Sequence, residues 1–165
     1  MKLKIKTLLI ISLSILVTMK ASAETYNDQE NGLKFDTGQL VLSKSESKPN
    51  ITIFKSGEAP FSVNVQYKLV HNNLTISEFI ENERKKNTEY PKDSKVEFTE
   101  IKINGFDAHE LKRENRLGNI HWLVFQKKGD KKIYSFWILE NKNLSLENKV
   151  ALSGYNLMKN SLTFF

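Results

Sequence analysis

The segment from residue 120 to 139 constrains the fold most, because it forms two apolar runs on either side of Gly129-Asp130. Alternation places apolar side chains on both faces of the two strands that we expect here. One face carries Leu123, Phe125, Tyr134, Phe136 and Ile138, and the other carries Ile120, Trp122, Val124, Ile133 and Trp137. A sheet that is apolar on both faces must be covered on both faces. The chain therefore has to supply a cover for each side.

Two turns set the register of the strands around this segment. Asn104-Gly105 is typical of a two-residue hairpin turn with positive φ at both positions, and Gly129-Asp130 is predicted to be a second such turn. With residues 115–118 as the connection, the two hairpins form a four-stranded meander over residues 94–139. The predicted partners are Ile103 with Phe106, Lys102 with Asp107, Ile101 with Ala108, Lys128 with Lys131, Phe125 with Tyr134, Leu123 with Phe136, and Trp122 with Trp137.

Two helices are available as covers. The first begins at Thr75, which can form a capping box with Glu78. Its buried stripe is predicted to be Ile76, Phe79 and Ile80. The second begins near residue 145 and ends near residue 160, and the apolar residues that it carries are Leu146, Val150, Tyr155, Leu157 and Met158.

Further strands are expected before the first helix. They cover residues 32–42, as one strand or two short ones, then 51–54 and 61–70. The apolar residues of the first are Leu33, Phe35, Leu40 and Leu42, and those of the last are Phe61, Val63, Val65, Tyr67 and Leu69. The chain has no repeat and no linker. We therefore expect one α+β domain over residues 24–165.

Residues 1–23 have the order of a secretory signal peptide. Lysines precede an apolar stretch, and Ala21-Ser22-Ala23 is typical of a signal peptidase site, so cleavage is predicted between Ala23 and Glu24. The apolar stretch is shorter than the roughly 20 residues of a membrane span, and no cysteine is present for a lipid anchor. A periplasmic or secreted protein without a stable membrane anchor is expected, with an uncleaved N-terminal anchor as the alternative.

The charge of the remaining chain argues against nucleic acid as a partner. The whole sequence has 25 basic and 19 acidic residues. Four of the lysines lie in residues 1–23, which contain no acid, so the rest has 25 − 4 = 21 basic residues and a net charge of 21 − 19 = +2. A nucleic-acid-binding domain usually keeps a strong basic excess.

The sequence offers no catalytic motif. It lacks cysteine, a G-x-S-x-G segment and a glycine-rich phosphate loop. His109 is predicted to lie opposite Val124 and His121 opposite Lys112, about 10 Å apart at about 3.3 Å per residue and on opposite faces of the sheet. We predict no metal site, no cofactor and no enzymatic activity. A hydrolase whose active-site residues are scattered along the chain stays an open alternative.

Two features are candidates for binding. The first is the Trp122 and Trp137 pair, since Trp is favoured where proteins anchor partners, although such a pair also suits a core under a helix. The second is the basic tip of the last hairpin, which could meet an acidic partner or an anionic lipid or could simply keep the tip soluble and prevent edge pairing. This lysine tip consists of Lys127, Lys128, Lys131 and Lys132.

The order of elements, with the export signal, resembles the PsbP-like and Mog-like superfamily and within it the bacterial DcrB-like periplasmic proteins. The likeness rests on residues 31–35 (NGLKF), on Asn104-Gly105-Phe106-Asp107-Ala108 as a small hairpin, on the aromatic meander, and on a closing helix that runs into Ser161-Leu162-Thr163-Phe164. It implies an α/β/α sandwich with a central antiparallel sheet and two main helices. The family has no shared catalytic motif and is known for binding and accessory roles.

Two departures limit what the resemblance implies. DcrB-like members are lipoproteins, whereas this chain lacks the lipid-accepting cysteine. The effector chaperones of the superfamily are cytoplasmic, whereas this chain carries a predicted export signal. We expect an exported, non-enzymatic binding or accessory protein of the bacterial cell envelope that contacts an unidentified protein partner. The alternative is a small-ligand or lipid-binding periplasmic protein, with a cleft between sheet and helix lined by the Trp pair. The oligomeric state is not predicted.

Overall fold

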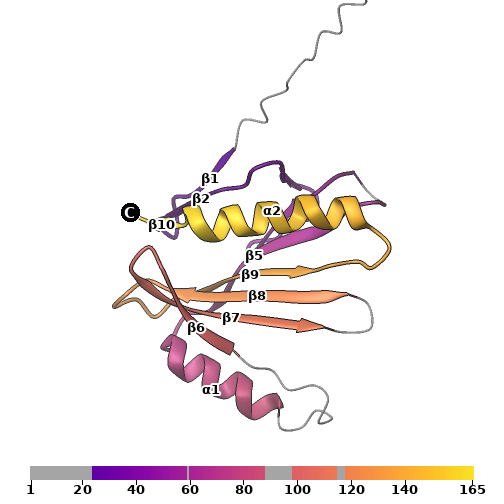
Figure 1. Cartoon of the computed structure of the whole chain (residues 1–165). Coiled ribbons are helices and arrows are strands. Elements are labelled where there is room, and N and C mark those ends of the chain that lie inside the picture. The colour runs from indigo at the N-terminus through magenta and orange to yellow at the C-terminus, as the bar shows by residue number, and fades with distance from the viewer. Residues whose placement is uncertain (1–23, 59, 88–97, 115–117) are drawn as a thin grey trace, which may run out of the picture.

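The computed structural model describes residues 24–58, 60–87, 98–114 and 118–165. These residues form an α+β fold of two helices and two antiparallel sheets (Figure 1). The helices are α1 (Ile76–Asn87) and α2 (Ser145–Ser161). The strands are β1 (Thr25–Asp28), β2 (Leu33–Asp36), β3 (Val41–Leu42), β4 (Ile51–Lys55), β5 (Asn64–His71), β6 (Phe98–Ile103), β7 (Phe106–Glu114), β8 (Asn119–Gln126), β9 (Ile133–Leu139) and β10 (Thr163–Phe164).

The larger sheet joins two runs of consecutive strands. Its order is β3-β4-β5-β9-β8-β7-β6, and β5 pairs with β9, so the strands before and after α1 become neighbours. The registers predicted from the two turns are confirmed. Ile103 pairs with Phe106, Phe125 with Tyr134, and Trp122 with Trp137.

One face of this sheet packs against α2 and the smaller sheet, which has the order β1-β2-β10. α2 contacts β9, β5 and β2, and it lies on the opposite side of the large sheet from α1 (Figure 1). The core between these layers is rich in aromatic residues. Phe35 of β2 meets Phe136 of β9 edge to face, with ring centroids 4.8 Å apart. Leu33, Phe125 and Tyr155 are fully buried in the same core.

The other face of the large sheet packs against α1. Ile76, Phe79 and Ile80 are buried there, as predicted. The capping box is also confirmed. The Thr75 N–H donates to Glu78 Oε2 at 2.8 Å, and the Glu78 N–H donates to Thr75 Oγ1 at 3.3 Å. Gln126 of β8 attaches the start of α1 to the sheet as well. Its side chain forms hydrogen bonds with the backbone of Leu74 and of Ile76, on either side of Thr75.

Three predictions about local structure are wrong. Of Gly129 and Asp130, only Gly129 has a positive φ, 81°, and the Asp130 N–H donates to the Lys127 carbonyl at 3.0 Å. This geometry is typical of a type II turn, which ends the strand ladder at Gln126 and Ile133, so Lys128 and Lys131 are not ladder partners. Phe61, expected on the buried side of its strand, is 66% exposed, because β5 starts only at residue 64. Leu146 of α2 is 67% exposed, since this helix packs through later turns.

The segment over residues 32–42 divides between the two sheets. β2 joins the smaller sheet and β3 joins the larger one. The predicted signal peptide of residues 1–23, and with it Ala23 of the cleavage site, lies outside the described residues, and Glu24 is the first residue described. The expected start of the meander at residues 94–97 and most of its 115–118 connection lie outside them as well. In the part of the chain that is described, neither helix is long and apolar enough to cross a membrane.

Candidate functional site

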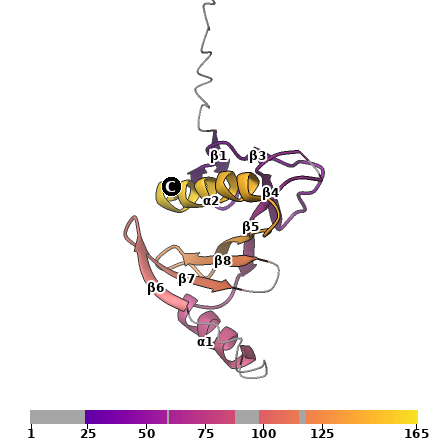
Figure 2. The same cartoon turned by 45° about the vertical axis from the view of Figure 1, so that its right-hand side comes forward.

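Within the described part of the chain, no helix lies over the β5 end of the α1 face of the large sheet. Seven strands spaced about 4.8 Å apart make a sheet about 29 Å wide, whereas a helix with its side chains is only about 10–12 Å across. α1 contacts β7 and β8 (Figure 2). Ile133 of β9 is buried beside α1, whereas Gln66 of β5 and Trp137 of β9 are partly exposed on the same face.

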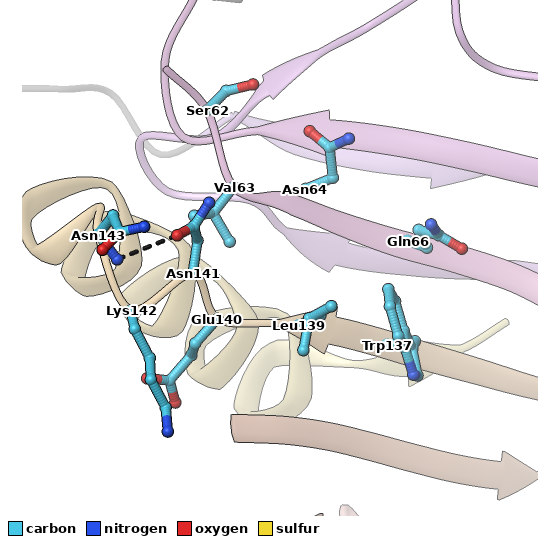
Figure 3. A pocket seen from close by; sticks show the side chains of 10 residues that line it. All are labelled: Ser62, Val63, Asn64, Gln66, Trp137, Leu139, Glu140, Asn141, Lys142 and Asn143. Atoms are coloured by element: carbon cyan, nitrogen blue, oxygen red, sulfur yellow. Dashed lines mark hydrogen bonds between the residues drawn. The ribbon is translucent and has the colours of Figure 1, made fainter. Parts of the chain in front are cut away.

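A hollow of about 610 Å³ lies where β5 and β9 meet the loop that follows β9 (Figure 3). We call it the amide groove, because four of its lining side chains are carboxamides. The lining residues are Ser62, Val63, Asn64, Gln66, Trp137, Leu139, Glu140, Asn141, Lys142 and Asn143. A smaller hollow of about 240 Å³ adjoins it, shares Gln66 and Trp137, and is also lined by Lys68, Val70, Trp122 and Ser135.

Strand register brings the central groove residues together. Gln66 of β5 pairs with Trp137 of β9, and Asn64 lies two positions before Gln66 on the same face. Asn64 Oδ1 is buried and has no hydrogen-bond partner. A buried acceptor without a donor costs free energy. Because this atom is shielded from water, a ligand in the groove could bond to it only if the Asn64 side chain moved.

The loop that closes the groove is held by its own amides. The Asn141 N–H donates to Asn148 Oδ1 at 2.9 Å, and Asn148 Nδ2 donates to the Asn141 carbonyl at 2.7 Å. The Asn143 N–H donates to Asn141 Oδ1 at 3.0 Å (Figure 3). These bonds join the loop to the first turn of α2. The bond from the Asn143 N–H therefore holds the side chain of Asn141 in place at the groove.

The charged residues at the groove have partners outside it. Glu140 Oε1 lies 2.6 Å from His121 Nε2, and both side chains are only 16% exposed. Lys142 Nζ lies 3.9 Å from Glu114 Oε1. The groove therefore presents mainly uncharged amides, a hydroxyl and an indole ring.

The two candidate tryptophans are cross-strand neighbours, as predicted, but they have different surroundings. Trp122 packs edge to face against Phe79 of α1, with ring centroids 6.1 Å apart, and against Phe98 of β6 at 5.4 Å. Trp137 lies in the amide groove. The expected cleft between sheet and helix, lined by both rings, is therefore replaced by a groove on the uncovered sheet. Trp122 reaches only the adjoining hollow.

The lysine tip lies at the far end of the last hairpin and is not part of the groove. Lys132 Nζ donates to Asn31 Oδ1 at 3.1 Å, and Lys127 Nζ lies 5.8 Å from the centroid of the Phe164 ring. Asn31 lies in the turn before β2, and Phe164 lies in β10, so Lys132 and Lys127 both contact the smaller sheet or one of its turns. Lys128 and Lys131 are exposed.

The histidines do not form a shared site. His109 pairs with Val124 and His121 with Lys112, as expected. His109 lines a hollow beside α1, with Arg84 and Glu100, whereas His121 lies beside Tyr155 of α2. Burial lowers the pKa of His109, and Arg84 acts in the same direction. Among the described residues, no group of three or more His, Asp or Glu side chains could hold a metal ion.

Sequence reasoning missed the amides of the groove. Asn64, Gln66 and Lys68 were the polar side of a half-buried strand, which is usually solvated. The sequence contained one usable signal. Only one helix was available for that face of the sheet, which indicated that part of the face would stay uncovered, although the pairing that puts Gln66 beside Trp137 came from the structure.

Comparison with known proteins shows the fold alone. No family model and no curated protein matches the chain. Among solved structures, the chain is similar to a protein from Bacteroides thetaiotaomicron VPI-5482 whose crystal structure was determined at 1.50 Å resolution. The TM-score is 0.52 at 10% sequence identity, and the match covers 87% of this chain and 48% of the other. The chain thus spans about half the length of that protein.

Proposed function

We propose that this chain is an exported, non-enzymatic binding or accessory protein of the bacterial cell envelope, periplasmic or secreted, which binds through the amide groove. Its architecture is then the α/β/α sandwich of the PsbP-like and Mog-like superfamily, nearest to the DcrB-like proteins. The observation that carries the proposal is Trp137 on a partly exposed sheet face, in a hollow that is lined by four carboxamides.

The side chains of the groove support binding over catalysis. Carboxamides and an indole ring recognise a ligand by hydrogen bonds and contact area, but they are poor proton-transfer groups and poor nucleophiles. Ser62 is the hydroxyl residue at the groove, and no histidine lines it. Glu140 is already paired with His121.

Two kinds of occupant have specific support. A protein partner is favoured by Trp137 together with Phe61, which is 66% exposed and directly precedes the groove residue Ser62. Exposed aromatic residues of this kind anchor protein interfaces. A small ligand is favoured by the volume of about 610 Å³, which lies within the roughly 300–1,000 Å³ of ligand pockets.

Crosslinking in intact envelopes tests the proposal. The tagged full chain is crosslinked gently and purified, and the attached proteins and glycans are identified by mass spectrometry. We expect one reproducible species near stoichiometry that is lost in Trp137→Ala and retained in Lys131→Ala, which changes an exposed side chain away from the groove. If nothing attaches above background, or if both variants retain the same species, the groove is not the binding surface.

A further inference from the structure

We infer that the amide groove takes a short stretch of a neutral oligosaccharide. This inference deepens the proposed function, on which it rests, by naming the chemistry of the occupant. The first observation is the position of Trp137 directly across from Gln66 on the neighbouring strand. The apolar C–H face of a sugar ring can stack on an indole, while its hydroxyls reach amides at the edge of the ring.

The hydrogen-bonding groups of the groove match hydroxyls in particular. A carboxamide offers donors and acceptors together, and a sugar hydroxyl can donate one bond and accept others. Asn64 lines the groove, and its Oδ1 has no hydrogen-bond partner among the described residues. Gln66, Asn141 and Asn143 surround the same space (Figure 3). A vicinal diol can bridge two such amides, which a purely apolar ligand cannot do.

The charges of the groove argue against ionic and lipid ligands. For a phosphate or carboxylate, the cation that lines the groove is Lys142, whose charge is partly offset by Glu114 at 3.9 Å. An amine would compete with His121 for Glu140. A lipid chain would face Asn64, Gln66 and two loop amides rather than a continuous apolar wall. Lys68 belongs to the adjoining hollow, so an acidic glycan could reach a cation only there.

The test is a glycan array that carries neutral hexose, N-acetylhexosamine and acidic oligosaccharides, followed by calorimetric titration with the best trisaccharide. The protein is purified from cells that express the full chain. Because the sequence holds two tryptophans, Trp122→Phe leaves Trp137 as the reporter for a parallel fluorescence titration. We expect saturable binding of a neutral glycan and a change in Trp137 emission.

Substitutions separate the groove from the rest of the surface. We expect Asn64→Ala and Gln66→Ala each to weaken the best neutral trisaccharide at least tenfold. Asn156→Ala, which removes an exposed amide on α2 outside the groove, should leave affinity unchanged. Both groove variants are checked for folding by circular dichroism, and they keep Trp137 in place.

Three results would overturn the inference. The first is that no glycan on the array binds, and the second is that only acidic glycans bind. The third is that a neutral glycan binds with an affinity that Asn64→Ala and Gln66→Ala do not change. A silent array together with a partner protein that is captured from envelopes and lost in Trp137→Ala would remove the saccharide but keep the proposed function. If both experiments are silent, both proposals fail.

Discussion

Gln126, the last residue of β8, holds α1 against the sheet through two hydrogen bonds. Its Nε2 donates to the Leu74 carbonyl at 2.8 Å, and its Oε1 accepts from the Ile76 N–H at 2.8 Å. The residue is 8% exposed. The Ile76 N–H belongs to the first turn of α1, where backbone donors lack partners within the helix. One side chain therefore satisfies both a helix donor and the carbonyl just before the helix.

Gln126→Met keeps the length of the side chain and removes both bonds. A buried group left without a partner costs about 1–3 kcal/mol, and the Leu74 carbonyl is only part-buried, so we expect the free energy of unfolding to fall by about 2–4 kcal/mol in total. For a domain of this size, that is a decrease in Tm of about 6–12 °C. Urea unfolding followed by circular dichroism measures the change, and the slope of the transition should stay the same.

Two further variants sharpen the test. Gln66→Met makes the same chemical change on the same sheet, but at a groove residue that does not hold α1, and should alter stability by less than about 0.5 kcal/mol. Gln126→Glu can still accept from the Ile76 N–H, but a carboxylate has no proton for the Leu74 carbonyl. The loss of stability of Gln126→Glu relative to the parent should therefore be smaller at pH 4, where the carboxyl group is more protonated, than at pH 7. A Gln126→Met protein as stable as the parent would refute the reasoning.

Three other variants test the remaining supports of the fold. Burial holds the pKa of His109 below its ordinary value. The parent should therefore lose stability as the pH falls from about 6.5 through the folded-state pKa. His109→Gln should show a smaller drop in urea midpoint between pH 7.5 and pH 5, and an equal drop would contradict this. Thr75→Ala removes half of the capping box and should cost about 1 kcal/mol in urea unfolding; no change would mean that Gln126 alone fixes the start of α1. Gly154→Ala places a Cβ 2.3 Å from Leu40 Cδ1 and should cost about 1–3 kcal/mol. Adding Leu40→Ala should then cost less than the same change in the parent, and strict additivity would argue against this contact.

The groove shows where prediction from sequence stopped. Trp122 and Trp137 were recognised as a pair because the turn at Gly129 sets their register, even though the type of that turn was predicted wrongly. Gln66 could not be placed beside them. Its strand, β5, comes before α1 in the sequence and β9 comes after it, and no local rule pairs these two strands. Asn141 was not among the predicted binding residues, although it lines the groove.

The sequence by itself determined the elements that depend on neighbouring residues. Asn104 and Gly105 define one hairpin and its register, since few residues tolerate positive φ. Thr75 and Glu78 start α1 through bonds three residues apart. The apolar character of both faces between residues 120 and 139 predicted a cover on each side, which α1 supplies over β7 and β8 but not over Trp137. These features follow from local chemistry and from alternation along a strand.

Only the tertiary structure decided which distant surfaces share a boundary. It placed β5 beside β9 and divided residues 32–42 between two sheets. It also set α1 over β7 and β8 and left the surface around Trp137 open. The physical reason is that burial of apolar area is not directional, so many pairings of these elements satisfy the same pattern. The choice among them depends on how all the faces pack at once.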